Sequence, residues 1–148
     1  MALIGYLVDT SALARSRRNP QIQARLEQLG TQRLLLRCGI TDLEVLHSAV
    51  SPADYERTRA DLNSGLTDLP ITPQIVGRAL DVQRALARAS QHRGVSLPDL
   101  IIAACAEVHG ATVVHYDADY DRIAAVTGQP VEWVVPRGSA EPGSAADQ

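Results

Sequence analysis

The sequence predicts a single α/β domain, with a mainly parallel central sheet flanked by helices. Three observations lead to this prediction. The chain has 148 residues, which suits one hydrophobic core. Short apolar segments alternate along it with segments of helical periodicity, and no tight hairpin turn joins two apolar segments. Because parallel neighbouring strands need a long crossover, this alternation favours a parallel sheet.

The predicted strands are short apolar runs bounded by turn-forming or capping residues. The first run meets Asp9 directly, and the fourth meets Asp117. A continuous apolar run indicates a strand that is buried on both faces, as parallel strands usually are. In chain order the predicted strands cover residues 3–8, 34–38, 66–71, 111–116 and 131–135.

The predicted helices are recognised mainly by their first residues. Some begin with a capping side chain followed by proline, which suits the first helical position. Others begin with the capping-box patterns Thr41-x-x-Glu44 and Ser96-x-x-Asp99. Segment 100–108 is apolar almost all round, which predicts a deeply buried helix. The helices are predicted after Ser11, from Asn19 to Gly30, from Thr41, from Ser51, from Thr72 to about Ser90, and from Ser96 to Gly110.

Composition excludes several classes of protein. The chain is 45% hydrophobic and 21% charged, with a net charge of -3, so it is neither a disordered chain nor a membrane protein. The two cysteines lie far apart in apolar surroundings, which predicts buried free thiols and a cytoplasmic location. All basic residues are arginine, which fits a GC-rich genome without implying a ligand. We predict a domain over residues 1–136 and a flexible tail over 137–148.

Acidic residues from distant parts of the chain are expected to meet at one edge of the sheet. Asp9 and Asp117 follow predicted strands, and the ligand crevice of an open parallel sheet lies beyond the carboxyl ends of its strands. Glu44 and Asp99 lie in the first turns of predicted helices, and Asp119 extends the cluster. Several carboxylates this close together would repel one another unless a positive charge lay among them.

Such a cluster, with no cysteine or histidine ligands, favours Mg²⁺ or Mn²⁺ over zinc. These ions can polarise a phosphodiester and activate water, which is the chemistry of acid-cluster nucleases. Each acid also has a simpler interpretation. Asp9, Glu44 and Asp99 can cap helices, and the segment around Asp117 and Asp119 can be a solvated turn. These alternatives stay open at this point.

Four segments, in order, resemble the motifs of the PIN-domain nucleases, and among them the VapC-type toxins of bacterial toxin–antitoxin pairs. The resemblance covers nearly the whole chain, to Val135. The motifs are Leu7-Val8-Asp9-Thr10-Ser11-Ala12-Leu13, Thr41-x-x-Glu44, Leu97-Pro98-Asp99-x-x-Ile102-Ala103-Ala104 and His115-Tyr116-Asp117-x-Asp119-Tyr120-x-x-Ile123.

The resemblance implies cleavage of RNA by water activated at Mg²⁺ or Mn²⁺, leaving 5′-phosphate and 3′-hydroxyl ends. Thr10 or Ser11 is expected to orient a water or a ligand. Tyr120 stands where the family more often has phenylalanine, and we expect this difference to affect packing only. His115 is given no chemical role. The implied catalytic acids are Asp9, Glu44, Asp99, Asp117 and, as an accessory, Asp119, with Asp9, Asp99 and Asp117 as metal ligands.

The resemblance also implies partners. These are an RNA substrate, a second copy of the chain in a homodimer, and a VapB-type antitoxin whose C-terminal segment enters the acidic groove. Operator DNA would be bound only indirectly, through the antitoxin, and no membrane is involved. A solvated surface is an equally good interpretation of the candidate RNA contacts. Those candidates are Arg15, Arg17, Arg18, His92 and Arg93.

Other functions fit the sequence less well. A phosphatase with an aspartyl nucleophile needs a second acid two residues after Asp9, where this chain has Ser11. A phosphoacceptor receiver domain needs a lysine, and the chain has none. Two alternatives stay open: a PIN-like module that binds RNA or a partner without cutting, and a housekeeping nuclease that processes RNA.

Overall fold

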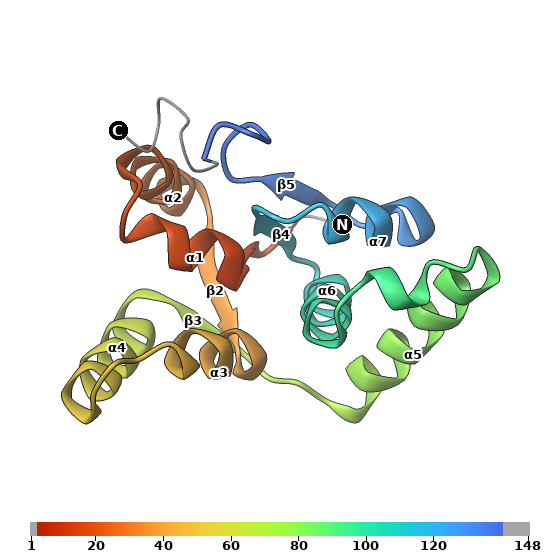
Figure 1. The fold of residues 1–148 in the computed structure, drawn as a ribbon, viewed down its shortest axis with the longest axis horizontal. Helices are drawn as coiled ribbons and strands as arrows, with labels where there is room; N and C mark the ends of the chain where they lie inside the picture. The colour runs from red at the N-terminus through yellow and green to blue at the C-terminus, as the bar shows by residue number, and fades with distance from the viewer. Residues whose placement is uncertain (1–2, 141–148) are drawn as a thin grey trace.

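The computed structural model describes residues 3–140, which form one α/β domain around a five-stranded sheet. The strand order is β3-β2-β1-β4-β5, and every neighbouring pair is parallel, so the predicted fold class is confirmed. Figure 1 shows the helices around this sheet. The elements are β1 (Gly5–Val8), α1 (Thr10–Ser16), α2 (Pro20–Gln32), β2 (Leu34–Cys38), α3 (Gly39–His47), α4 (Pro52–Gly65), β3 (Thr67–Leu69), α5 (Pro73–Arg88), the short 3-10 helix η1 (His92–Gly94), α6 (Leu97–His109), β4 (Thr112–His115), α7 (Asp119–Thr127) and β5 (Val131–Trp133).

Alternate side chains of each central strand enter different cores, as the pleat of a strand requires. Leu7 of β1 and Val113 of β4 pack in the cluster that includes α5 and α6. Val8 and Val114, the next residues, pack in the cluster that includes α1 and α2. All four side chains are fully buried. Helices therefore cover both faces of the sheet, which explains the continuous apolar runs in the sequence.

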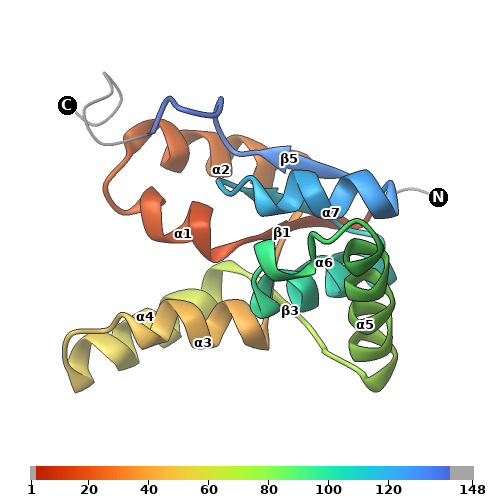
Figure 2. The ribbon, with the colours of Figure 1, turned by 45° about the vertical axis from the view of Figure 1, so that its right-hand side comes forward.

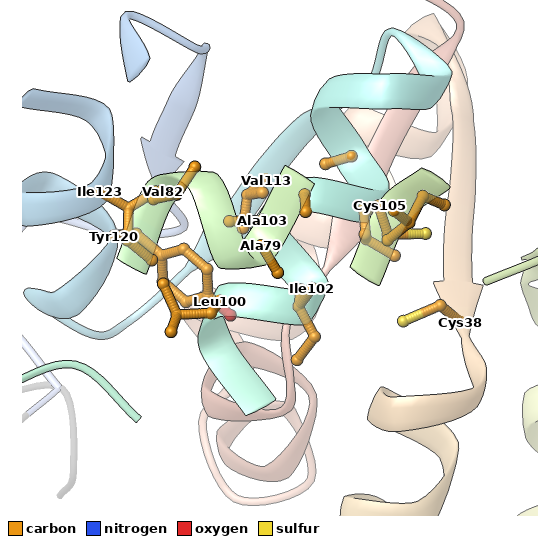
Figure 3. Packing of buried hydrophobic residues seen from close by; sticks show 14 of the residues in the cluster. Cys38, Ala79, Val82, Leu100, Ile102, Ala103, Cys105, Val113, Tyr120 and Ile123 are labelled. Atoms are coloured by element: carbon orange, nitrogen blue, oxygen red, sulfur yellow. The ribbon is translucent and has the colours of Figure 1, made fainter. Parts of the chain in front are cut away.

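Helix α6 lies at the centre of the larger core, as its apolar sequence predicts. Figure 3 shows its residues Ile102 and Ala103 beside Ala79 of α5. Both cysteines, Cys38 and Cys105, are free and buried in the same cluster, as predicted.

Helices α3 and α4 form a pair that extends away from the sheet in both Figure 1 and Figure 2. This pair has a small core of its own, made by Val45, Leu46 and Leu62. Helix α3 also contacts α1 and α6 near the ends of the central strands. The pair is therefore anchored at its α3 end, and this anchor brings Glu44 toward the strand ends.

Three helices differ from the prediction. Helix α2 does not end at Gly30 but continues to Gln32. Helix α3 begins at Gly39 rather than after Thr41, because the Thr41 side chain closes back on residue 38: its Oγ1 accepts a hydrogen bond from the backbone N–H of Cys38 at 3.0 Å. Helix α7 was not predicted, since segment 117–121 resembles a turn. Tyr120 and Ile123, one helical turn apart, are both fully buried against α5 and α6 and anchor this helix.

The predicted tail falls only partly within the described residues. The hydroxyl oxygen of Tyr116 accepts hydrogen bonds from the backbone N–H groups of Gly138 and Ala140, at 2.8 and 3.0 Å, and Ala140 is buried. Residues 137–140 are thus tied to the domain, whereas residues 141–148 lie outside the described residues. Between residues 3 and 140, no helix is long and apolar enough to cross a membrane.

The direction of chain growth reverses between β1 and β4. From β1 the chain moves outward to β2 and β3, then crosses to β4 and moves outward again to β5. Open parallel sheets bind ligands at the carboxyl ends of the strands beside such a switch point. The residues that follow β1 and β4 are Asp9, Tyr116 and Asp117.

Candidate active site

Asp9 follows β1 and turns the chain into α1. Its backbone N–H donates to the carbonyl of Val114 in the neighbouring strand at 2.9 Å, which continues the β1–β4 ladder by one residue. Its carboxylate oxygen Oδ2 accepts from the N–H of Ser11 at 3.0 Å and from the Ser11 hydroxyl at 2.6 Å. Asp9 therefore does cap α1, yet it is only 2% exposed and its second oxygen faces the interior.

Asp99 occupies the capping-box position of α6 but does not complete the box. The Ser96 hydroxyl accepts from the N–H of Asp99 at 3.3 Å, as a capping residue should. The N–H of Ser96 donates instead to Asp119 Oδ2, also at 3.3 Å. Asp119 thus takes the place that the capping box assigns to Asp99. The Asp99 carboxylate is left to point into the domain, where it is 5% exposed.

Asp117 and Asp119 lie in the connection between β4 and α7. The N–H of Asp119 donates to Asp117 Oδ1 at 2.9 Å, which closes a tight turn around the first carboxylate. One carboxylate oxygen from each of Asp99, Asp117 and Asp119 lies within 4.8 Å of the others, a spacing that a single metal ion can span. The segment around Asp117 and Asp119, which the sequence also allowed to be a solvated turn, is therefore part of the acidic cluster.

Glu44 of α3 closes the cluster on the side of α1. Its Oε1 accepts a hydrogen bond from the hydroxyl of Thr10 at 3.1 Å. Burial raises the pKa of the Glu44 carboxyl, the bond from Thr10 opposes the rise, and the negative charges of Asp9 and Asp117 add to it. Because α3 begins at Gly39, Glu44 lies beyond the first turn and is no capping residue.

The cluster carries more negative charge than its surroundings balance. Burial, followed by repulsion from Asp9 and Asp117, raises the pKa of Asp99 to about 8. Its oxygen Oδ2 is buried and has no hydrogen-bond partner within residues 3–140. An unpartnered buried carboxylate oxygen is costly, and a divalent cation would satisfy it. A cluster whose ligands are all carboxylate oxygens suits a hard cation.

The tightest group of acids differs in one member from the predicted ligands, which were Asp9, Asp99 and Asp117. The spacing that suits one ion is met by Asp99, Asp117 and Asp119. Both oxygens of Asp119 are already engaged, Oδ2 by Ser96 and Oδ1 by Arg122 at 3.0 Å. The predicted ligand set therefore stays a prediction.

Tyr120 contradicts the expectation that its difference from phenylalanine affects packing only. Its hydroxyl donates to Asp9 Oδ1 at 2.6 Å and lies 3.1 Å from Asp99 Oδ1. Burial, and then the charges of Asp9 and Asp99, raise the pKa of Tyr120 well above its ordinary value, so the hydroxyl keeps its proton. The sequence alone could not reveal this contact, because the tyrosine lies 111 residues from Asp9.

Two further residues contact the cluster and were not assigned a role. His115 is fully buried, burial lowers its pKa, and its Nδ1 accepts from the N–H of Asp117 at 3.1 Å. Arg122 Nη1 donates both to Asp119 Oδ1 and to the Gly94 carbonyl, at 3.0 and 3.1 Å. Arg122 thus ties η1 to the start of α7. Its only sequence signal is its position one turn after Asp119.

The predicted RNA-contacting arginines lie in two places. Arg15, Arg17 and Arg18 line a cleft of about 780 Å³ that also includes Thr10 and Glu44. The Arg15 guanidinium lies over the Tyr116 ring, 4.6 Å from its centroid, and Arg17 Nη2 donates to the Thr58 hydroxyl at 3.1 Å. The other candidates, His92 and Arg93, are exposed in η1, outside this cleft.

Comparison with known proteins places this architecture in a family. Residues 6–126 match the PIN domain family. Ribonuclease VapC21 of Mycobacterium tuberculosis is 50% identical over 136 residues, which cover 91% of this chain and 97% of that protein. The solved structure of VapBC-1 from nontypeable Haemophilus influenzae has a TM-score of 0.72 at 21% identity, covering 87% of this chain and 97% of that chain. The DNA-bound VapBC from Salmonella typhimurium has a TM-score of 0.69 at 23% identity, covering 90% and 100%.

Proposed function

We propose that this chain, which belongs to the PIN-domain family and within it to the VapC ribonucleases, is a metal-dependent endoribonuclease and the toxin of a type II toxin–antitoxin pair. The relative named above is a ribonuclease, and it is 50% identical to this chain over nearly the full length of both proteins. The observation that carries the proposal is the cluster formed by acids that follow β1 and β4 and acids of α3 and α6, in which one buried carboxylate oxygen of Asp99 has no hydrogen-bond partner within the described residues.

The cation we propose is Mg²⁺ or Mn²⁺, held by the carboxylates of Asp9, Asp99 and Asp117. When bound, such an ion supplies Lewis acidity and lowers the pKa of water to near neutrality. Asp119 lies beside these acids and is held by hydrogen bonds from the Ser96 N–H and from Arg122. Glu44, whose pKa is raised and which lines the cleft with the arginines, would accept a proton from the attacking water. Cleavage would leave 5′-phosphate and 3′-hydroxyl ends.

RNA would approach through the cleft that joins Thr10 and Glu44 to the arginines of α1. Phosphate contacts from arginine position a strand without reading its sequence. Arg18 is the most available of the three, since Arg15 donates to the Ser11 carbonyl at 3.0 Å and Arg17 contacts Thr58. Thr10 and Ser11 border the acids through their hydrogen bonds to Glu44 and Asp9 and would orient water or substrate there.

The partners we propose are a VapB-type antitoxin, a second copy of the chain, and DNA through the antitoxin alone, in the cytoplasm. The structural neighbours described above are VapBC complexes, one of them bound to DNA. Exposed leucine side chains on three helices are candidates for contacts with these partners. They are Leu43 of α3, Leu80 of α5 and Leu97 of α6.

The experiment that tests the proposal is cleavage of total and structured RNA by the purified chain in Mg²⁺, in Mn²⁺ and in EDTA. We expect metal-dependent cuts that Asp99→Asn abolishes while leaving the fold intact. The matched control is Asp81→Asn, which neutralises an exposed acid on α5. Equal faint cutting by all three proteins would indicate a contaminating nuclease and would favour a module that binds RNA or a partner without cutting it.

A further inference from the structure

Among the described residues, the hydroxyl of Tyr120 is the only group that contacts the carboxylates of both Asp9 and Asp99 within hydrogen-bond distance. The Tyr120 ring belongs to α7 and packs in the main core with Leu100 and Ile123, as Figure 3 shows. The residue is fully buried, so the core fixes the position of its hydroxyl. From that position the oxygen lies 2.6 Å from Asp9 Oδ1 and 3.1 Å from Asp99 Oδ1.

Because of this contact, the two carboxylate oxygens of Asp99 have different surroundings. Oδ1 faces Tyr120, whereas Oδ2 has no partner within the described part of the chain. A carboxylate held at one oxygen cannot rotate freely about its Cβ–Cγ bond. The contact therefore leaves Oδ2 as the oxygen without a hydrogen bond, in a residue that forms with Asp117 and Asp119 a group that one ion can span.

Asp9 is held in a similar way from two sides. Its Oδ2 accepts two hydrogen bonds from Ser11, and its Oδ1 accepts the hydrogen bond from Tyr120. The Ser11 hydroxyl also accepts from the N–H of Tyr116 at 2.8 Å, so this side is fixed to the end of β4. Without Tyr120, the Oδ1 side of Asp9 would be held by no hydrogen bond from the described residues.

We propose that Tyr120 is a positioning residue of the metal site, whose hydroxyl holds the carboxylates of Asp9 and Asp99 together and orients them for a divalent cation. The proposal rests on the metal dependence proposed above. The hydroxyl acts through the two carboxylates and need not touch the ion or the RNA. A preorganised pair of ligands binds a cation more tightly than a pair that must first be ordered.

The experiment is a calorimetric titration of the metal-free protein with Mn²⁺ alone, carried out for wild type and for Tyr120→Phe. The substitution keeps the ring and removes only the hydroxyl. We expect Mn²⁺ to bind about tenfold more weakly, since one hydrogen bond to a charged group is lost. The matched control is Tyr6→Phe, which removes the hydroxyl of another buried tyrosine, one that donates to Gln32 Oε1 of α2 at 3.3 Å. The control should bind Mn²⁺ like wild type.

Activity measurements then separate positioning from a general loss of structure. In Tyr120→Phe the Mn²⁺ concentration for half-maximal cleavage should rise about tenfold, while kcat at saturating Mn²⁺ stays within about twofold of wild type. Equal Mn²⁺ affinity in wild type and Tyr120→Phe would overturn the assignment. If wild type itself bound no Mn²⁺, the proposed metal-dependent function would fail instead, so the two failures are distinguishable.

A double-mutant cycle in EDTA gives a readout that needs no metal. If the hydroxyl acts on Asp99, removing it in an Asp99→Asn background should change the melting temperature by a different amount than in wild type. Additive changes would mean that Tyr120 and Asp99 are energetically independent, which would also contradict the proposal.

Discussion

At the scale of single residues, the structure shows why a capping pattern and a catalytic pattern can share the same letters. Ser96-x-x-Asp99 predicts a capping box, and Ser96 does cap α6. A carboxylate from another helix, that of Asp119, takes the N–H that Asp99 would otherwise accept from. Asp99 is thereby released into the interior. The acid that accepts the hydrogen bond from the Ser96 N–H is determined by a contact between residues 23 positions apart, and the local sequence carries no information about that contact.

The raised pKa of Asp99 predicts how stability changes with pH. Its pKa is about 8 in the folded protein and near 4 in an unfolded chain, so the folded state binds more protons between these values. The free energy of unfolding should therefore fall as pH rises from about 4 to about 8. In EDTA, Asp99→Asn should be more stable than wild type at pH 8.5, by at least about 1 kcal/mol, with a smaller difference at pH 5.

Chemical denaturation at both pH values checks this prediction. Asp81→Asn provides the comparison, because it removes an exposed acid of the same kind. A wild-type protein whose stability did not decrease across this range would contradict a protonated, buried Asp99.

The hydroxyl of Ser11 makes a second prediction at this scale. It donates to Asp9 Oδ2 and accepts from the N–H of Tyr116, so it joins the ends of β1 and β4. Ser11→Ala leaves a backbone N–H without its partner and should lower the free energy of unfolding by about 1–3 kcal/mol. Ser64→Ala, which removes an exposed hydroxyl on α4, should change it by less than about 0.5 kcal/mol. Urea denaturation of the two variants measures both; equal losses would refute the role given to Ser11.

At the scale of elements, the glycine with the closest neighbour, among those that the structure describes, is Gly5 at the start of β1. A Cβ added to Gly5 would lie 2.3 Å from the carbonyl oxygen of Leu34 in β2, which is backbone and cannot rotate away. Gly5→Ala should therefore push β1 from β2 and destabilise the protein by about 1–3 kcal/mol.

Gly77, inside α5, has nothing within 4 Å of the corresponding position. Gly77→Ala should stabilise the protein by about 0.5–1 kcal/mol, because alanine is the better helix former. Thermal melts of the two variants should thus move in opposite directions. A neutral Gly5→Ala would show that the strands can separate at this end without cost.

Much of this element arrangement could be predicted from the sequence, and most of what was missed depends on contacts between distant residues. Asn19 and Ser51 cap helices as predicted, because an N-cap depends on neighbouring residues alone. Helix α7 was missed because it is stabilised by burial of Tyr120 and Ile123 against other helices. The candidate acids could be named, since each lies at the end of a strand or near the start of a helix. The roles of Tyr120 and Arg122 could not, because each depends on contacts across the fold.

At the scale of the whole molecule, the acidic cluster brings together segments that are far apart in the sequence. Asp9 follows the first strand, Glu44 belongs to the pair of helices that extends from the sheet, Asp99 belongs to the central helix, and Asp117 lies in the second half of the chain. The site exists only when both halves of the sheet meet at β1 and β4. A ligand of this site therefore binds the folded protein and not the unfolded chain.

This dependence predicts that a divalent cation stabilises the whole domain. A ligand present at about 100 times its dissociation constant adds about 2.7 kcal/mol to the free energy of unfolding. For a domain of this size the melting temperature should then rise by roughly 5–10 °C. We expect Mn²⁺ to give this rise in wild type and in Asp81→Asn and to give none in Asp99→Asn, when melting is followed with and without EDTA. An equal rise in melting temperature in all three proteins would mean that the cation binds elsewhere on the molecule. No rise in wild type would mean that the acidic cluster binds no divalent cation.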